Sequence, residues 1–303
     1  MERDSSGQLW KCMMSGRRLW LVLLSSLLIL GLVAAACGNG EESTLEQAQE
    51  EGSIRIGFAN EAPYGFADES GNVTGEAPEV AKAVLSRMGI NEVDGVVVPF
   101  GSLIPGLQAG RFDVIAAGMF INPDRCDQIL FSDPDYAIPQ GFGVEAGNPH
   151  QIFTFADVAA NPDVQLGVMA GAVEHGYAQD NGVPDSQLTV FDDTPSMAEA
   201  LQAGRIDAFA LTTLSVKAQL ERLGDPGLEA TPGFIAEVAG EPQFGAGGYG
   251  FRKSDQDLRD AFNDVLVSMK QNNEILPITE PFGFGQDEIG AARDLTAEQL
   301  CAR

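Results

Sequence analysis

The feature that most constrains the fold is a ten-residue segment that occurs twice, as LQAGRFDVIA at residues 107–116 and as LQAGRIDAFA at residues 201–210. Seven of the ten positions are identical, and the copies lie 94 residues apart. In each copy, helix-favouring residues end at a glycine suited to a helix C-terminus, and an Arg-x-Asp turn leads into an apolar strand. A helix followed by a short apolar strand is typical of a parallel sheet covered on both faces. The repeat therefore predicts an α/β fold with two related lobes.

The pattern of apolar residues around the repeats agrees with this fold. We expect strands at residues 54–59, 96–98 (a buried strand), 164–168, 188–191 and 206–211. We expect helices at residues 78–88, 173–179, 195–203 and 214–223, and a short helix capped by Gly101 or Ser102 that ends before Gly110.

Two similar segments mark the connections between the lobes. GFGVEAGN at residues 141–148 and GYGFRKSD at residues 248–255 each place an aromatic residue between glycines, then a strand residue, then a turn. We interpret them as two crossings, so that lobe 1 comprises residues 53–143 plus 246–303 and lobe 2 comprises residues 144–245. Two crossings form a hinge, and a hinge between two lobes allows a cleft to close.

The N-terminal segment has the marks of an export signal. Lys11, Arg17 and Arg18 precede an uncharged apolar run at residues 19–36, and three alanines stand directly before Cys37. Residues 1–36 are therefore predicted to be a signal peptide. The alanines resemble a bacterial lipobox, which predicts lipidation of Cys37. An uncleaved membrane anchor stays open as the alternative, because the run is at the short limit of a spanning helix.

The residues that follow Cys37 are acidic, polar and poor in apolar side chains. Such a composition favours a flexible chain, and we predict a tether at residues 37–52. The localisation that follows is an exported protein, either lipid-anchored at the outer face of the cytoplasmic membrane or periplasmic.

Composition excludes several classes of function. With 44 acidic and 18 basic residues the chain has a formal net charge of −26, so nucleic acid is an improbable partner. The sequence contains two histidines and no CxxC pair, which leaves little material for a zinc site or a histidine-based catalytic triad. We therefore expect no metal, no cofactor and no catalytic residues. In an exported protein Cys126 and Cys301 can form a disulfide or remain two buried thiols, and composition does not decide between these.

Arg125 stands five residues beyond Phe120, at the end of the apolar run that the first repeat opens. Together with this run, IRIGFANEAPYGF at residues 54–66 and NPDRCDQILFSDPDY at residues 122–136 resemble the polar-amino-acid family (family 3) of solute-binding proteins of ABC importers. The resemblance implies a two-lobed periplasmic-binding-protein-like fold of type II. It also implies that Arg125 clamps a ligand carboxylate, which a guanidinium can bind with two parallel hydrogen bonds. The plain alternative is a surface arginine paired with Asp124 or Asp127.

The resemblance extends over nearly the whole chain after Cys37 and is greatest to the ectoine/hydroxyectoine-binding proteins. The segments that carry it are ANEAPYGF, FGSLIPGLQAGR, AAGMFINPDRC, NPDVQLG, LQAGRID and the C-terminal TEPFGF with LTAEQLC. It implies a monomeric receptor that delivers a zwitterionic solute to an ABC permease. It also implies a bridge between Cys126 and Cys301, since both cysteines stand where that subgroup has them.

The resemblance further implies a site made of an aromatic box with acidic and basic anchors. Its residues are Glu61, Tyr64, Phe100, Gly118 through its backbone, Phe120, Arg125, Val173 at a helix start that offers backbone N–H groups from residue 171 onward, and Asp193. A delocalised cation is stabilised over aromatic faces, a carboxylate by a guanidinium and a helix N-terminus, and ring N–H groups by carboxylates. Phe100 and Phe120 can also be interpreted as ordinary core residues, and Asp192 competes with Asp193.

Two residues depart from the patterns of the relatives. Thr212 stands where amino-acid binders usually carry an aspartate for the α-ammonium group, which favours a ligand without one. Val173 stands where ectoine binders usually have a hydroxyl residue, which predicts weaker carboxylate binding or a shifted preference among related osmolytes. A polar amino acid or a betaine is the alternative ligand. An enzyme on the same fold would need an acid–base pair, and Glu61 with Glu174 is the one candidate pair.

Overall fold

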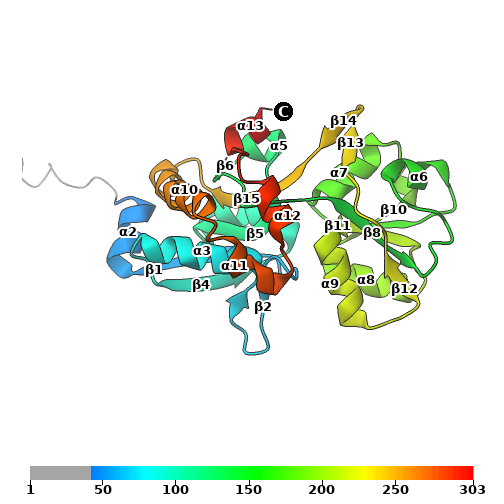
Figure 1. Ribbon diagram of the computed structural model, residues 1–303, viewed down its shortest axis with the longest axis horizontal. Coiled ribbons are helices and arrows are strands. Elements are labelled where there is room, and N and C mark those ends of the chain that lie inside the picture. The colour runs from blue at the N-terminus through cyan, green and yellow to red at the C-terminus, as the bar shows by residue number, and fades with distance from the viewer. Residues whose placement is uncertain (1–41, 303) are drawn as a thin grey trace, which may run out of the picture. The chain divides into compact units, whose positions relative to one another are not determined.

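The computed structural model describes residues 42–302 (Figure 1). The predicted signal peptide, the lipidation residue Cys37 and the first part of the predicted tether lie outside the described residues. The described chain forms two mixed sheets with helices around them, and it crosses from one sheet to the other and back.

The first sheet has the strand order β4-β1-β5-β15-β6, and β7 also pairs with β15, along residues 245–247. Strands β1, β4 and β5 are parallel, whereas β15 runs antiparallel to β5, β6 and β7. The bounds are β1 Ser53–Phe58, β4 Glu92–Val97, β5 Val114–Phe120, β6 Leu130–Phe131, β7 Tyr136–Ile138 and β15 Gly245–Phe251. A small hairpin, β2 Phe66–Ala67 with β3 Val73–Thr74, follows β1.

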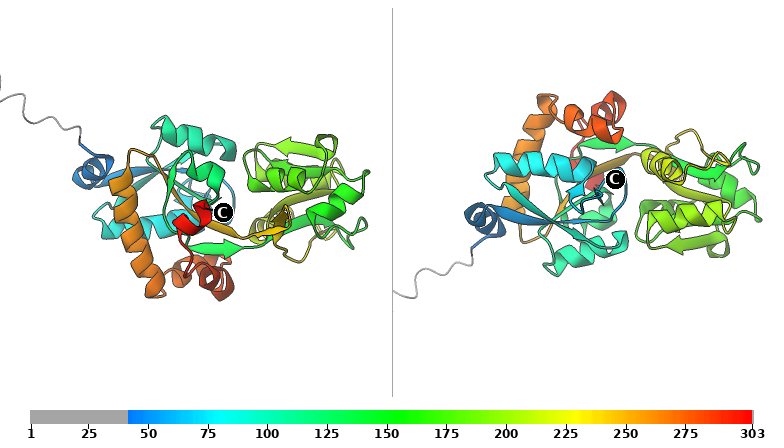
Figure 2. Two further views of the ribbon diagram at one scale, coloured as in Figure 1. Left: turned by 90° about the horizontal axis from the view of Figure 1, so that it is seen from above. Right: turned by 90° about the horizontal axis from the view of Figure 1, so that it is seen from below.

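Helices cover both faces of this sheet, and Figure 2 shows α3 and α4 on opposite sides of it. Alternate residues of β5 explain the arrangement. Val114 and Ala116 join the core beneath α3 and α10, and Ile115 joins the core beneath α4, because successive side chains of a strand point to opposite faces. The helices of this lobe are α2 Thr44–Glu51, α3 Glu76–Arg87, α4 Leu103–Gln108, α5 Pro123–Cys126, α10 Gln256–Gln271, α11 Leu276–Thr279, α12 Gln286–Ala291 and α13 Ala297–Cys301, with 3-10 turns at Phe100–Ser102 and Glu280–Phe282.

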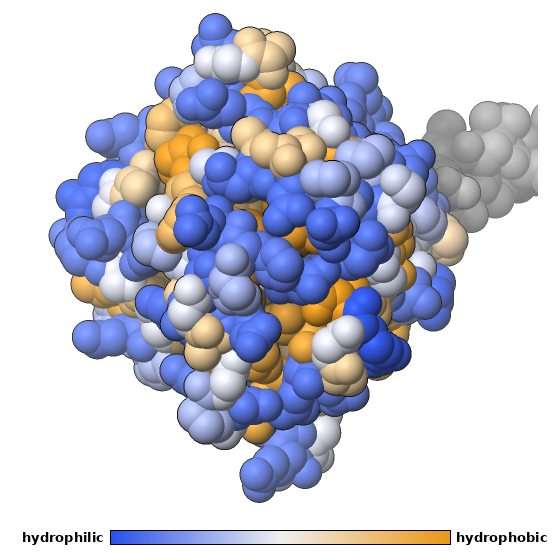
Figure 3. Space-filling model, turned by 90° about the vertical axis from the view of Figure 1, so that its right-hand side faces the viewer, coloured by the Kyte–Doolittle hydropathy of each residue, from blue (hydrophilic) through white to orange (hydrophobic). Residues whose placement is uncertain are grey.

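The second sheet has the order β10-β9-β11-β8-β12. Its strands are β8 Gln140–Glu145, β9 Leu166–Met169, β10 Leu188–Phe191, β11 Ala208–Thr212 and β12 Leu228–Ala230; β13 Ala236–Val238 and β14 Glu241–Gln243 form a separate hairpin. Its helices are α6 Phe155–Ala160, α7 Val173–Asp180, α8 Thr194–Gln202 and α9 Thr213–Leu223, with a 3-10 turn at Asp185–Gln187. The face of the molecule in Figure 3 is mostly hydrophilic, in keeping with the acidic composition, and its apolar patches are small and separate.

The two copies of the repeat occupy equivalent places. The first forms the end of α4 and the start of β5, and the second forms the end of α8 and the start of β11. Gly110 and Gly204 have φ values of 68° and 64°, a left-handed conformation in which glycine carries no steric penalty. In each sheet the repeat strand has a parallel neighbour on one side and an antiparallel crossing strand, β15 or β8, on the other. The prediction of two related α/β lobes from this repeat therefore agrees with the topology.

Three predicted features differ from the structure. Residues 44–51 form helix α2 rather than part of a flexible tether, because the helix buries Ala48 against the first lobe. Strand β4 is an exposed edge strand and not a buried one, and the Val97 side chain is 58% exposed. The first crossing lies at Pro139, between β7 and β8, and therefore precedes the predicted boundary at residue 143. Gly141 and Gly143 pair with β11, so they already belong to the second sheet.

A buried pair of carboxyl groups lies under the crossing strands of the first lobe. Glu76 begins α3, Asp135 precedes β7, and both are almost completely inaccessible. Asp135 Oδ2 accepts a hydrogen bond from the Tyr249 hydroxyl of β15 at 2.7 Å, whereas neither carboxylate oxygen of Glu76 meets a donor among the described residues. Burial raises the pKa of both carboxyl groups. The charge of Asp135 raises the pKa of Glu76 further, whereas the hydrogen bond with Glu76 opposes the rise in the pKa of Asp135. Two carboxyl groups buried side by side favour the state in which they share one proton over the state in which both are ionised.

This pair predicts that stability falls as pH rises above the ordinary carboxyl range. The unfolded chain releases the Glu76 proton near pH 4.5, whereas the folded protein keeps it to a higher pH. Unfolding between these two pH values therefore releases a proton, and the free energy of unfolding decreases by up to about 1.4 kcal/mol per pH unit in this interval. Glu76→Gln should flatten the dependence of Tm on pH between pH 5 and pH 8, whereas Glu69→Gln at an exposed turn should leave it unchanged. Parallel slopes for wild type and Glu76→Gln would contradict the shared proton.

Candidate functional site

A cavity lies where strand ends of the two lobes meet. It is lined by Glu61, Tyr64, Phe100, Gly118, Phe120 and Arg125 of the first lobe and by Met169, Ala172, Val173, Glu174 and Leu211 of the second. Several of these residues follow the C-terminal ends of β1, β5 and β9, which is where open α/β sheets bind ligands. The cavity volume is about 30 Å³, well below the 300–1,000 Å³ of ordinary ligand pockets. A ligand of ordinary size therefore fits only if the cavity widens, as it would if the lobes moved apart.

Arg125 is held in the cavity by a short helical turn. Asn122 caps α5 and accepts a hydrogen bond from the Arg125 backbone N–H at 2.9 Å. The side chain is buried, and its Nη1 and Nη2 atoms donate to the carbonyl oxygens of Phe120 at 2.7 Å and Gly171 at 2.9 Å. Its guanidinium carbon lies 5.5 Å from the centre of the Phe100 ring, which is a cation–π distance. This geometry disfavours the alternative of a surface arginine.

Two acidic side chains line the same cavity. Glu61 is buried, and its Oε1 atom accepts a hydrogen bond from the Ser215 hydroxyl at 2.6 Å. Burial raises the pKa of Glu61 to about 7, and the bond from Ser215 opposes the shift. Glu174 lies in the first turn of α7, and burial likewise raises its pKa to about 7. In the amide orientation that satisfies its neighbours, Gln140 donates to Glu174 Oε1 at 2.7 Å and to the Leu211 carbonyl at 3.2 Å.

Aromatic rings surround the basic and acidic groups. Tyr64, Phe100 and Phe120 line the cavity, and Tyr136 and Phe284 pack behind Tyr64 with ring centroids 5.3 and 5.4 Å away. Gly118 fits beneath Tyr64 with φ of 64°, and a Cβ atom there would lie 2.2 Å from Cδ1 of the tyrosine. The Gly118 carbonyl accepts a hydrogen bond from the Tyr136 hydroxyl at 2.7 Å, so it already has a partner within the protein.

Direct contacts hold the two lobes together around the cavity. The Tyr64 hydroxyl donates to Thr212 Oγ1 at 2.8 Å, and this bond joins the loop that follows β1 to the end of β11. The Ser215–Glu61 and Arg125–Gly171 hydrogen bonds also join the lobes. The described structure is therefore a closed arrangement, in which lobe 2 engages three residues that the sequence places in the ligand site.

Asp193 does not belong to the cavity, which corrects the prediction. Its side chain is exposed and caps helix α8, accepting from the Ser196 backbone N–H at 2.7 Å and from the Ser196 hydroxyl at 2.9 Å. Asp192 is exposed as well and does not line the cavity either. The order Asp-Thr-Pro-Ser at residues 193–196 is a helix-start signature, and this signal favours a capping role over a ligand role.

The predicted helix start on lobe 2 is present, and some of its backbone groups already have hydrogen-bond partners within the protein. Val173 begins α7 and lines the cavity. Gly171 contributes its carbonyl oxygen as an acceptor to Arg125, and the Ala172 N–H bonds to the Met169 carbonyl at 3.2 Å. Sequence reasoning missed Gln140 and Ser215, because nothing in their local sequence indicates which distant carboxylate each one meets.

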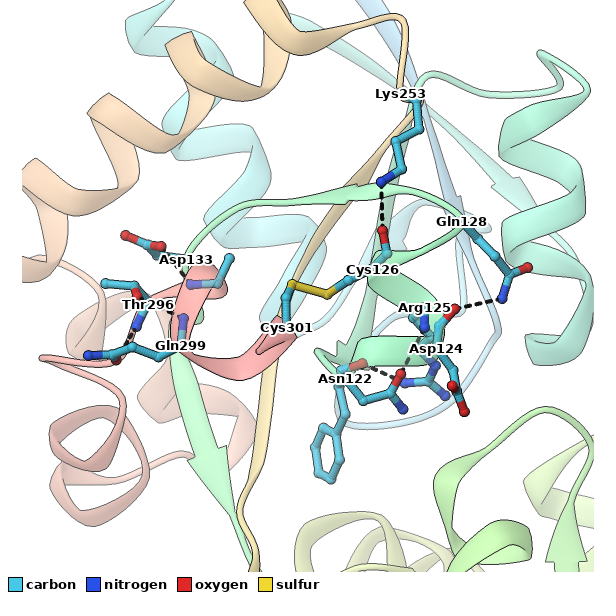
Figure 4. The surroundings of a disulfide bond; sticks show 12 residues. Asn122, Asp124, Arg125, Cys126, Gln128, Asp133, Lys253, Thr296, Gln299 and Cys301 are labelled. Atoms are coloured by element: carbon cyan, nitrogen blue, oxygen red, sulfur yellow. Dashed lines mark hydrogen bonds between the residues drawn. A yellow bond between two sulfur atoms is a disulfide. The ribbon is translucent and has the colours of Figure 1, made fainter. Parts of the chain in front are cut away.

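A disulfide joins Cys126 to Cys301 across 175 residues of sequence. Figure 4 shows it beside Arg125, between α5 and the C-terminal helix α13. Two further bonds fix this region: Lys253 Nζ donates to the Cys126 carbonyl at 2.7 Å, and the Ala297 N–H donates to Asp133 Oδ1 at 2.9 Å. The C-terminal segment is thereby attached to the same short helix that carries Arg125.

Two lobes joined by two crossings, with a charged and aromatic cavity between them, define a receptor that closes around a small solute. The chain belongs to the bacterial extracellular solute-binding proteins, family 3, which it matches over residues 54–286. The resemblance to this family predicted from the sequence, and the two-lobed periplasmic-binding-protein fold with it, are thus confirmed. Proteins of this family are the binding components of importers and not enzymes.

Individual relatives support this assignment. The chain is 36% identical over 261 residues to a probable amino-acid ABC transporter periplasmic-binding protein, y4tE, of Sinorhizobium fredii, with 86% of each chain covered. It is similar to the crystal structure of EhuB in complex with hydroxyectoine at 38% identity and a TM-score of 0.78, covering 86% of this chain and 98% of that one. An ancestral arginine-binding protein bound to arginine matches at 27% identity and a TM-score of 0.67, covering 76% and 98%.

The chain is accordingly an extracytoplasmic solute-binding receptor of an ABC importer of the amino-acid type. Among residues 42–302, no helix has the length and apolar character needed to cross a membrane.

The contact between Gly118 and Tyr64 generates a prediction about the site. Gly118→Ala should destabilise the protein by roughly 2–4 kcal/mol, because the new methyl group needs both a left-handed backbone and the space of the Tyr64 ring. Thermal unfolding would measure the loss. Gly89→Ala is the matched control: it carries the same left-handed strain, with φ of 87°, but a Cβ atom there meets nothing within 4 Å. Equal losses in the two variants would contradict the close packing of Tyr64 on Gly118.

Proposed function

We propose that this receptor binds ectoine or hydroxyectoine and delivers it to its permease. The observation that carries the proposal is the buried guanidinium of Arg125, which faces two carboxyl groups across a cavity lined by aromatic rings. Such a solute has a carboxylate for the guanidinium, and a delocalised cationic ring for the aromatic faces and for Glu61. A relative with 38% identity binds hydroxyectoine, which supports the same class of ligand here.

Thr212 favours this solute over an ordinary α-amino acid. Its hydroxyl is neutral, nearly buried, and already bonded to the Tyr64 hydroxyl. An α-ammonium group placed there would meet a neutral hydroxyl instead of a carboxylate at this position, so its charge would be less well neutralised. A polar amino acid or a betaine is the second candidate, because Val173 at the start of α7 departs from the hydroxyl residue that is usual in ectoine binders.

Isothermal titration calorimetry on residues 38–303 tests the proposal, and it suits a segment that contains no tryptophan. We expect micromolar or tighter binding of ectoine or hydroxyectoine, and weaker or no binding of glycine betaine, proline and polar amino acids. Arg125→Ala should weaken binding by about 30-fold or more, because truncation of a buried charge partner costs about 2–5 kcal/mol. Phe120→Ala should weaken it by roughly 3- to 30-fold through loss of a cation–π face.

Arg205→Ala, an exposed arginine in the turn of the second repeat, is the matched control and should bind as the wild type does. Tight binding of an α-amino acid with no heat from ectoine would overturn the ligand assignment while leaving the receptor class unchanged.

We also propose that residues 1–36 are removed on export and that Cys37 becomes the lipidated N-terminus of a monomeric receptor. The support is the order of basic residues, apolar run and small residues before Cys37. Cells that express the full chain and are fed an alkyne analogue of palmitate should yield labelled protein in the membrane fraction. Cys37→Ser should abolish the label, and Cys12→Ser should retain it. An intact mass that still includes residues 1–36 would indicate an uncleaved anchor instead.

A further inference from the structure

The charges around the cavity do not balance those of a zwitterion. Arg125, Glu61 and Glu174 are the ionisable acids and bases that line it, apart from the hydroxyl of Tyr64. If both carboxyl groups are ionised, the lining has a net charge of −1. A zwitterion adds no net charge, so the closed and loaded site would bury one negative charge without a partner. Such a charge costs several kcal/mol in a site withdrawn from water.

The ligand and Ser215 together favour the ionised form of Glu61. The Ser215 hydroxyl donates to Glu61 Oε1 at 2.6 Å, and a hydrogen bond to the charged form stabilises it. Under the proposed function the second oxygen of Glu61 would meet the cationic ring of the solute. The negative charge on Glu61 is then stabilised by the Ser215 hydroxyl on one oxygen and by the cationic ring of the solute on the other.

Glu174 is in a different position, because it lies in the field of Arg125. The guanidinium lowers the pKa of Glu174, and the charge of Glu61 raises it. A ligand carboxylate on Arg125 would offset the guanidinium charge and bring a further negative charge near Glu174. The one cationic influence on Glu174 is thus neutralised when the site is loaded.

Other ionisable groups near Glu174 come first from its own helix, which carries His175, Tyr177 and Asp180, and the first lobe contributes Tyr64. His175 directly follows Glu174, and adjacent residues of a helix do not face each other. On the elements packed against α7, strand β9 has no ionisable side chain, Asp157 of α6 caps its own helix, and Glu237 of β13 is exposed. Gln140 donates a neutral amide hydrogen to Glu174 Oε1, and the backbone N–H of Glu174 bonds to its own carboxyl group, so both of these donors are uncharged.

We propose that Glu174 is a neutral acid in the loaded site, so that the receptor takes up about one proton together with each zwitterionic solute. This inference rests on the proposed function, since it requires a ligand of zero net charge. A protonated Glu174 can donate a hydrogen bond toward the ligand carboxylate, which an ionised one would repel. A ligand with a net charge of +1 would instead bind with Glu174 ionised and without the proton.

The experiment is calorimetry with ectoine and hydroxyectoine at pH 8 in phosphate and in Tris, two buffers with very different enthalpies of ionisation. The difference in heat between the buffers gives the number of protons taken up. We expect a value near one, because the carboxyl group is mostly ionised at pH 8 in the free protein and protonated in the complex. Between pH 7.5 and pH 8.5 the dissociation constant should rise by up to about tenfold.

Two amide variants separate the roles of the acids. Glu174→Gln imitates the neutral acid, so it should retain binding at pH 8, take up no proton and lose the pH dependence. Glu61→Gln is the matched control of identical chemistry, and it should weaken binding at least about tenfold, since it removes the charge that faces the solute cation. Circular dichroism and unfolding curves of both variants would show whether they are folded.

The outcomes are distinguishable. Binding of ectoine with equal heats in the two buffers would leave the proposed function intact and overturn the inference. Loss of binding in Glu174→Gln would also overturn it, because the ligand would then need the anion. If no zwitterion binds and arginine binds without proton uptake, both the proposed function and the inference fail.

Discussion

The burial of one guanidinium is the interaction on which the site depends. Arg125 has no carboxylate ion pair among the described residues, and it is held by the carbonyl oxygens of Phe120 and Gly171 and by the face of Phe100. The two carbonyls belong to different lobes. A buried cation is tolerated only where dipoles or charges surround it, so the closed arrangement and the position of Arg125 stabilise each other. Because backbone carbonyls supply the bonds, the charge stays available for an anion from outside.

The other contacts between the lobes also involve residues of the candidate ligand site. Tyr64 and Glu61, which the ligand would meet, bond to Thr212 and Ser215 at the start of α9. Lobe 2 therefore forms hydrogen bonds directly to residues of the candidate ligand site. A ligand shifts the balance between open and closed forms only by its different affinity for the two forms, and contacts on both lobes provide that difference. Gln140 adds a connection to the hinge, since it is the first residue of crossing strand β8 and holds Glu174.

Much of the fold was predictable because its signals are local. The LQAGR repeat contains a helix end, a left-handed glycine and a buried strand, and each is determined by a few neighbouring residues. The errors arose where tertiary contacts decide. Residues 96–98 are apolar and suggest a buried strand, but strand β4, which ends at Val97, lies at a sheet edge. Helix α2 forms because Ala48 packs into the core of the first lobe. The crossing at Pro139 is defined by the pairing of β8 with β11, which no local pattern reveals.

The sequence by itself determined the α/β class, the two related lobes, the family and the residues Glu61, Tyr64, Phe120 and Arg125 as a candidate set. Repeats, glycine positions and residue types are written in the chain and do not depend on distant neighbours. Only the tertiary structure decided that Glu174 belongs to the cavity and that Asp193 caps a helix instead. The physical reason is that a carboxylate acquires its role from burial and from its partners, and these come from segments that are far apart in the sequence.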